Sequence, residues 1–166
     1  MRYLHERRKA LGGYLPHRRT KSDEQFTVPS LDTFKSVMDP TPEGREITLS
    51  SLRGKVVLID FWASWCKPCR MENPNVKRVY ERYKGKGFEI LGVSLDRDRN
   101  AWTGAIAQDG LPWKHVSDLG FWNNAAAQQY GVSSIPYTVL VDKDGKVIAK
   151  NLRGPALEEK LAEVLN

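Results

Sequence analysis

From Ile47 onward, the apolar residues of the chain alternate between two kinds of spacing. Residues 55–62 and 87–96 are near-continuous apolar runs rich in β-branched side chains, which is typical of strands covered on both faces. Residues 66–83 and 155–166 instead repeat apolar side chains at helical spacing. In residues 66–83 the stripe consists of Met71, Val76, Val79 and Tyr83. Each change of spacing predicts a change between strand and helix.

Weaker signals place the shorter elements between these runs. Gly110 and Gly131 predict the ends of two further helices, and an Asp-Lys-Asp-Gly turn between apolar runs predicts a hairpin. The expected pieces are helices at 97–110 and 120–131, a hairpin within 135–154, a short strand and turn at 46–54 and an extended piece at 111–118. Because strands alternate with helices and end in a hairpin, we expect an α/β fold with a central mixed sheet and helices on both faces.

Residues 1–43 form a basic and largely irregular N-terminal arm, and residues 44–166 form the folded domain. The arm shows no sustained period of either kind. The formal net charge of +6 falls on residues 1–21, where Glu6 is the one acidic residue among many Arg and Lys. Such a segment could bind nucleic acid or an anionic surface, but we interpret it as a solvated arm and expect no nucleic-acid partner.

The length of 166 residues suits one domain with its own core, and we expect a monomer. No stretch is long enough to span a bilayer. Positive charge in "MRYLHERRKALGGYL" is not followed by an unbroken apolar region, so no secretory signal is expected. As written, the chain is expected to stay where it is made, and a cytoplasmic location is possible.

The two cysteines of the chain lie within "FWASWCKPCR", residues 61–70, where a predicted strand gives way to a helix. Backbone N–H groups of the first helical turn and the helix dipole favour negative charge on Cys66. Thiols in such positions have pKa values below the free value of about 8.5. Cys69 is expected one turn further into the helix, where it is more shielded from solvent and close enough to Cys66 to form a disulfide. We therefore expect Cys66 to attack and Cys69 to resolve the mixed disulfide.

Two structural roles compete with a redox role for this pair. A structural zinc site needs four ligands, whereas the histidines, at positions 5, 17 and 115, are scattered, so we expect no metal. A disulfide that closes so small a loop would constrain little of the unfolded chain. Position and spacing favour the redox role, which needs no bound cofactor because the cysteines carry the electrons.

Asp60 lies within an apolar run, where an isolated carboxylate is costly. It is either a satisfied core residue or a group beneath the cysteine pair. In the second case burial raises its pKa and suits it to accept a proton from Cys69.

Trp65 and Pro136 are candidate substrate-binding residues. Trp65 either packs or forms an exposed docking surface beside the thiolate. The bond before Pro136 is either trans or cis. If it is cis, Ile135 is expected to lie against Cys66 and offer its backbone to an extended substrate. The residue pattern alone leaves the isomer open.

Taken together, these residues resemble the thioredoxin fold. "VVLIDFWASWCKPCRMENP" is similar to the thioredoxin active-site segment in its aspartate, tryptophan, CxPC and later proline, and "IPYTVLVDKDGKVI" resembles the cis-proline strand and hairpin. "ITLSSLRGKVVLIDFWASWCKPCRMENP" and "AWTGAIAQDGLPWKHVSDL" resemble, more narrowly, the TlpA-type thiol–disulfide oxidoreductases of bacterial cell envelopes. The resemblance implies Cys66 and Cys69 as the redox pair, a cis bond before Pro136 and Glu72 as an acidic neighbour that tunes the cysteines. It also implies a cell-envelope or periplasmic location.

The sequence departs from thioredoxin at two places. Thioredoxin has Gly-Pro between its cysteines and a lysine near its buried aspartate. Here the spacer is Lys67-Pro68, and Gly92 stands at about the place of the lysine. We therefore expect an incomplete Asp–Lys pair. Lys67 is expected to favour the Cys66 thiolate and make the site more oxidising.

The arm carries a different resemblance. Residues 2–40 resemble an internal segment of the decarboxylase subunit of bacterial pyruvate dehydrogenase, without recognisable thiamine-binding chemistry. One interpretation, favoured slightly, is a fused chain with its join near residues 38–46. The other takes "FTVPSLD", residues 26–32, as the leading hairpin of the TlpA-type proteins. Neither assigns catalysis to the arm.

Three functions are compatible with this pattern. The leading one is a thiol–disulfide oxidoreductase that exchanges disulfides with disulfide- or dithiol-containing protein substrates and is served by an upstream electron donor. A peroxidase of the peroxiredoxin type needs a threonine three residues before its cysteine, where this chain has Ala63. The third is a redox-inert or metal-handling binding module, and a copper chaperone of this fold needs a wider cysteine spacing and a nearby histidine.

Overall fold

The computed structural model describes residues 41–43, 47 and 49–166. The helices are η1 (Leu49–Leu52), α4 (Lys67–Tyr83), η2 (Lys84–Lys86), α5 (Arg99–Asp109), η3 (Phe121–Asn123), α6 (Ala125–Gln129) and α7 (Gly154–Leu165). The strands are β1 (Val56–Trp62), β2 (Phe88–Ser94), β3 (Lys114–Ser117), β4 (Tyr137–Val141) and β5 (Val147–Lys150). Almost all of the predicted arm, with its two interpretations, lies outside the described residues, so the division into arm and domain stays a prediction.

The five strands form one mixed sheet in the order β3-β2-β1-β4-β5. Strands β1, β2 and β3 are parallel, whereas β4 runs antiparallel to both β1 and β5. Every residue of the central strand β1 is buried, which explains its unbroken apolar run. The mixed sheet and its terminal hairpin confirm the predicted α/β fold.

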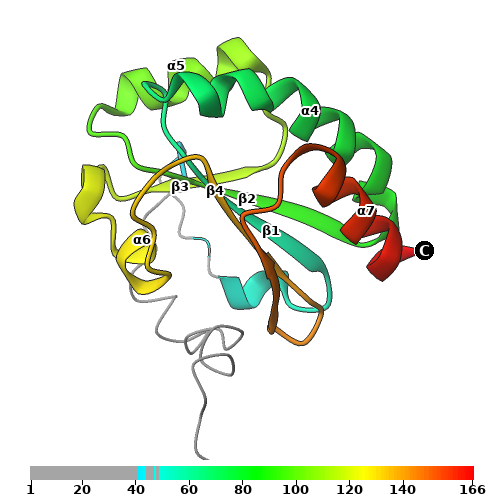
Figure 1. The fold of residues 1–166 in the computed structure, drawn as a ribbon. Helices are drawn as coiled ribbons and strands as arrows, with labels where there is room; N and C mark the ends of the chain where they lie inside the picture. Colours follow the sequence, from blue (N-terminus) through cyan, green and yellow to red (C-terminus); the bar gives the residue numbers. More distant parts are fainter. Residues whose placement is uncertain (1–40, 44–46, 48) are drawn as a thin grey trace, which may run out of the picture.

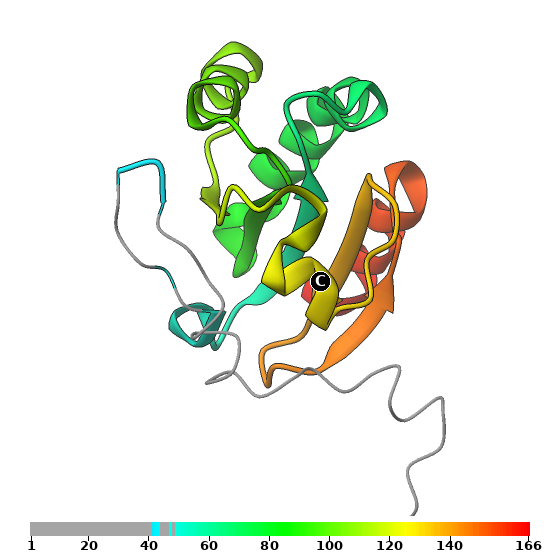
Figure 2. The same cartoon turned by 90° about the vertical axis from the view of Figure 1, so that its left-hand side faces the viewer.

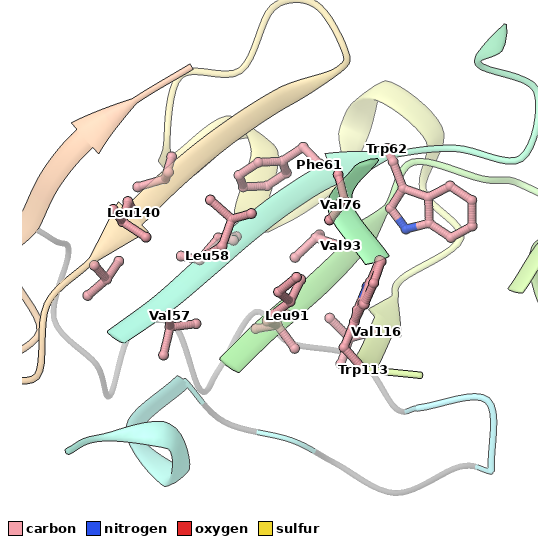
Figure 3. Close-up of a cluster of buried hydrophobic side chains, with 14 of the residues drawn as sticks. Val57, Leu58, Phe61, Trp62, Val76, Leu91, Val93, Trp113, Val116 and Leu140 are labelled. Atoms are coloured by element: carbon pink, nitrogen blue, oxygen red, sulfur yellow. The ribbon is translucent and has the colours of Figure 1, made fainter. Parts of the chain in front are cut away.

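Helices cover both faces of the sheet. Helix α4 contacts α5 and α7 on one face, and Figures 1 and 2 show α6 on the opposite side. Phe61 of β1 packs against Tyr130, which follows α6, with ring centroids 6.0 Å apart. Figure 3 shows how side chains of β1, β2 and β4 pack with Val76 of α4 in the shared core.

The buried stripe of α4 differs from the predicted one at Met71, whose side chain is 71% exposed. The buried positions are Cys69, Asn73, Val76, Val79 and Tyr83. Met71 stands two residues from both Cys69 and Asn73, which places it on the far side of the helix. The polar Asn73 concealed the true stripe in the sequence, since its Nδ2 donates to Oδ2 of Asp109 over 2.9 Å.

Two shorter predictions differ in part from the structure. The helix expected over residues 120–131 is split into η3 and α6, because Asn124 has extended backbone angles (φ −51°, ψ 124°) and caps α6 with its side chain. Its Oδ1 accepts the backbone N–H of Ala127 over 2.8 Å. In the described part of residues 46–54, the chain forms the 3-10 helix η1 and no strand, and the predicted turn follows at residues 53 and 54.

Candidate active site

Cys66 stands between the end of β1 and the start of α4, as predicted. It is the N-cap of α4, and its Sγ accepts the backbone N–H of Cys69 over 3.3 Å. Pro68 lies in the first turn, where a missing N–H costs little. Cys66 and Cys69 form a disulfide with their Cα atoms 5.3 Å apart. Both cysteines are nearly covered, with 4% and 2% of their surface exposed.

A buried carboxylate holds the loop that leads into Cys66. Asp96 is 1% exposed and accepts the backbone N–H of Ser64 at 3.1 and 3.2 Å from its two oxygens. The hydroxyl groups of Ser64 and Ser94 also donate to this carboxylate. Asp96 thus ties the turn before Cys66 to the end of β2, so the position of the first cysteine depends on contacts outside α4.

Arg70 holds the same loop from the other side. Its Nη1 donates to the backbone oxygen of Ser64 over 3.1 Å, and its Nε donates to Oδ2 of Asp109 over 2.6 Å. This hydrogen bond from Arg70 keeps the pKa of Asp109 below its usual value. The cysteine loop is therefore connected to the end of α5 as well as to β2.

Asp60 lies in a small pocket that Cys69 also lines. The pocket is lined by Asp60, Cys69, Glu72, Pro136, Thr138, Arg153 and apolar side chains of β1, α4 and α7. Asp60 is only 7% exposed. Burial, with a smaller contribution from the negative charge of Glu72, raises the pKa of Asp60 to about 7. A carboxyl group with this pKa exchanges protons near neutral pH.

Glu72 makes hydrogen bonds that connect two helices, and its negative charge also acts on Asp60. Its Oε1 accepts the backbone N–H of Gly154, at the start of α7, over 3.1 Å. The same oxygen accepts Nδ2 of Asn75 over 3.0 Å. Glu72 therefore joins the N-terminal half of α4 to the start of α7 while its charge acts on Asp60.

Gly92, at the position where the resemblance to thioredoxin led us to expect a lysine to be missing, pairs with Asp60 across β1 and β2. A Cβ atom on Gly92 would lie 2.7 Å from Nδ1 of His115, so the imidazole occupies the space that a side chain at position 92 would need. Burial lowers the pKa of His115 to about 4. At neutral pH this histidine is uncharged and does not replace the missing lysine as a cation.

Of the remaining predicted residues, Pro136 lies in one pocket with Cys69. The Ile135–Pro136 peptide bond is cis. Ile135 is half-buried against the core. Lys67 is exposed at the first position of α4. Trp65 is 48% exposed.

Sequence reasoning missed two groups of residues at this site. One is the support from Asp96 and Arg70, whose partners lie more than thirty positions away along the chain. The other is the pair Phe121 and Trp122, whose rings contact Trp65. The sequence "GFWNN" did carry a signal, since glycine and asparagine beside two large aromatic rings favour a loop over a continuous helix.

Among the described residues, no group of three or more His, Cys, Asp or Glu side chains is arranged to hold a metal ion. None of the helices in the described part of the chain is long and apolar enough to cross a membrane.

Comparison with known proteins agrees with this geometry. The family model described as Redoxin matches residues 27–165, beginning ahead of the predicted domain start at residue 44. The thiol-disulfide oxidoreductase ResA of Bacillus thuringiensis is 37% identical over 123 residues, which cover 74% of this chain and 69% of that protein. ResA of Bacillus subtilis is 29% identical over 154 residues, covering 93% of this chain and 83% of that protein.

A solved structure is similar over the same region. The thiol-disulfide oxidoreductase from Bacteroides fragilis superposes with a TM-score of 0.73 at 38% identity, covering 77% of this chain and 96% of that one. The mixed sheet, the cysteine pair at the start of α4 and these relatives lead to one assignment. The chain belongs to the redoxin family and is a thioredoxin-like thiol–disulfide oxidoreductase that exchanges disulfides through its CxxC pair.

Proposed function

We propose that Cys66 is the attacking thiol and Cys69 the resolving thiol of this oxidoreductase. In the reduced protein, the Cys66 thiolate attacks one sulfur of a substrate disulfide, and the other substrate sulfur leaves as a thiolate that takes up a proton. The Cys69 thiolate then attacks Sγ of Cys66, which reforms the protein disulfide and releases the reduced substrate. Two electrons pass from the cysteine pair to the substrate, and an upstream dithiol donor restores them.

The observation that carries this assignment is the position of Cys66 as the N-cap of α4. Its Sγ accepts the backbone N–H of Cys69 over 3.3 Å, and the same donor, together with the helix dipole, would stabilise a thiolate there. Lys67 adds an exposed positive charge next to this sulfur. Cys69 lies within the helix and has no comparable set of donors ahead of it.

Asp60 is proposed to accept the proton of the Cys69 thiol. The two groups line one pocket, and the pKa of Asp60, raised to about 7, leaves a substantial fraction of the carboxylate form at neutral pH. Glu72 and Pro68 are proposed to tune the pair, Glu72 through its charge and Pro68 through its place in the first helical turn.

Substrate binding is assigned to Trp65, Ile135 and Pro136. These residues approach the cysteines from different elements: Trp65 from the loop before α4, and Ile135 and Pro136 from the segment before β4. An extended substrate segment could pair with the backbone at Ile135 while its cysteine reaches Cys66.

Location and assembly are proposed at a coarser level. The TlpA-type resemblance supports a cell-envelope location and action as a monomer on protein substrates, without nucleic acid. Labelling of the reduced thiols by a membrane-impermeant maleimide in intact native cells tests the location. Protection of the thiols in intact cells, with labelling after lysis, would place the protein in the cytoplasm instead.

Reduction of insulin by dithiothreitol tests the activity, because catalysed cleavage of its disulfides produces turbidity. Turbidity above background is expected for the wild-type chain and for neither cysteine variant. Cys69→Ser is expected to accumulate mixed disulfides with insulin chains, whereas Cys66→Ser is not. A wild-type protein without activity would favour a redox-inert binding module, and mixed disulfides trapped by Cys66→Ser would reverse the two roles.

A further inference from the structure

Three aromatic side chains form one patch beside the cysteine pair. Ring centroids are 5.5 Å apart for Trp65 and Phe121, 6.1 Å for Trp65 and Trp122, and 6.0 Å for Phe121 and Trp122. Trp65 directly precedes Cys66 in the chain, while the other two residues belong to η3. We call Trp65, Phe121 and Trp122 the aromatic patch; in Figure 2, the segment that contains η3 and α6 lies toward the viewer.

The patch exposes apolar surface that a folded domain normally covers. Within the described part of the chain, three large hydrophobic side chains are exposed, and two of them, Trp65 at 48% and Trp122 at 37%, belong to the patch. The third, Met71, lies on α4. Adjacent exposed aromatic rings mark interaction sites more often than isolated ones do.

The loop that carries Phe121 and Trp122 is held in an unusual backbone conformation. Leu119 and Phe121 have positive φ angles of 53° and 55°, which non-glycine residues rarely adopt. Asp118 supports the loop: its Oδ1 accepts the backbone N–H of Gly120 and its Oδ2 that of Ala125, over 2.9 and 3.0 Å. Such conformations cost about 1–3 kcal/mol each and persist where surrounding contacts enforce them. Fixed hydrogen bonds therefore hold the rings of η3 against Trp65.

Positive charge borders the patch. The Arg97 guanidinium lies 4.3 Å from the centroid of the Phe121 ring, and its residue is exposed. Lys67, also exposed, follows the cysteine next to Trp65. Of the nearby carboxylates, Asp96 accepts hydrogen bonds from Ser64 in the cysteine loop, and Asp118 accepts the backbone N–H of Ala125. Arg97 and Lys67 therefore present two exposed positive charges beside the patch.

We propose that the aromatic patch selects oxidised substrate proteins that carry a large apolar side chain next to the reacting cysteine, with an acidic residue beside it. The apolar side chain packs on Trp65 and Trp122, and the acidic one pairs with Arg97. This inference rests on the proposed function of Cys66 and names the substrate class that it attacks. Aromatic rings with cations also suit nucleic-acid bases or a lipid surface, but direct adjacency to Cys66 favours a peptide, since any polypeptide that reaches this sulfur passes the patch.

The test uses disulfide-linked homodimers of three short peptides that differ at the two residues before their single cysteine: Asp-Phe, Lys-Phe and Ser-Ala. Second-order rates of reduction by the reduced protein are measured for each, with bis(2-hydroxyethyl) disulfide as a small uncharged substrate. The wild type is expected to prefer Asp-Phe to Ser-Ala by about tenfold. Trp122→Ala should reduce this preference to about twofold, and Arg97→Gln should remove the advantage of Asp-Phe over Lys-Phe. Met71→Ala, the matched exposed residue outside the patch, should keep every ratio.

A binding measurement separates this inference from the chemistry. The Asp-Phe peptide with serine in place of cysteine is titrated into the oxidised protein while tryptophan fluorescence is followed, and weaker binding by Trp122→Ala is expected. If the wild type reduces none of the disulfides but binds this peptide through the patch, the proposed function fails and the surface assignment stands. Equal rates for the three dimers, or an undiminished preference in Trp122→Ala, overturns the inference. Patch-dependent quenching by a dT oligonucleotide or an anionic vesicle, without peptide preference, would assign the surface to that ligand.

Discussion

The two sides of the cysteine pair differ in burial, in charge and in the kinds of side chain that they carry. Behind Cys69 lies a covered pocket with Asp60 and Glu72, where burial and like charge raise the pKa of Asp60 to about 7. Beside Cys66 lies the aromatic patch, open to solvent and bordered by Arg97 and Lys67. Helix α4 begins between them, so Cys66 stands at the start of the helix next to the exposed patch, and Cys69 lines the covered pocket.

This difference separates two kinds of sensitivity. Changes in the pocket alter groups that are buried and mutually packed, so they should affect stability and the pH dependence of the chemistry. Changes in the patch remove exposed rings and should affect the choice of substrate.

The largest effect is expected on stability, from Asp60→Asn. The pKa of Asp60 is about 7 in the folded protein and 3.8 as the ordinary value, so the folded state holds the proton more tightly. The contribution of Asp60 to the free energy of unfolding is therefore full below pH 4 and falls as the pH rises through 7, by on the order of 4 kcal/mol. Asparagine cannot ionise, so urea unfolding of the oxidised variant should show a gain over wild type at pH 8 and none at pH 4. A gain of equal size at both pH values would contradict the titration of Asp60.

The same substitution should slow resolution of the mixed disulfide about tenfold to a hundredfold near neutral pH, because a general base is lost. In the wild type this rate should rise with pH through about 7, as Asp60 ionises. The variant should lack that rise, while the initial attack by Cys66 keeps its rate. Stopped-flow measurement of product release from a preformed mixed disulfide gives the rate. A pH profile that survives in Asp60→Asn would leave Asp60 as a tolerated core residue.

Gly92→Ala should destabilise the protein by about 1–3 kcal/mol, since the added Cβ would lie 2.7 Å from Nδ1 of buried His115 and the ring would have to shift. The control is Gly104→Ala in α5, where a Cβ meets nothing within 4 Å. That change should be neutral or stabilise the helix by up to about 1 kcal/mol. Chemical denaturation of both variants at one pH compares them, and equal stabilities would show that His115 yields easily.

The chemistry of the pair and the order of the elements could be predicted from the sequence, because both depend on local signals. The apolar run of β1, the N-cap position of Cys66 and the Asp-Lys-Asp-Gly hairpin are each encoded within about ten residues. Asp60 was recognisable as a candidate because a charged residue inside a buried strand needs an explanation. Its role as a proton acceptor stays a prediction.

The supports of the site could not be predicted, because they join distant positions. Asp96 reaches Ser64 across 32 residues, and Arg70 reaches Asp109 across 39. The aromatic patch depends on the positive φ of Phe121, which helical spacing of apolar residues does not reveal. Met71 was misplaced for a related reason: the buried stripe of α4 includes Asn73, whose amide is satisfied by a partner in another helix.

The smallest effect is expected from Glu72→Gln. Glutamine keeps an oxygen that can accept from Gly154 and Asn75, so the contact between α4 and α7 should survive. The substitution removes the negative charge that, after burial, is the second cause of the raised pKa of Asp60. That pKa should therefore fall but stay above 3.8, because burial is unchanged.

Carbon-13 NMR of the Asp60 carboxyl group across pH gives the two titration curves directly. Glu81→Gln is the matched control, since Glu81 lies exposed on the same helix and pairs with Lys84 over 2.7 Å. It should leave the Asp60 curve in place. If Glu72→Gln leaves the curve unchanged as well, the charge of Glu72 is screened, and burial alone sets the protonation of the pocket. If the curve moves to lower pH, the rise in resolution rate should move with it, because the same carboxylate would govern both.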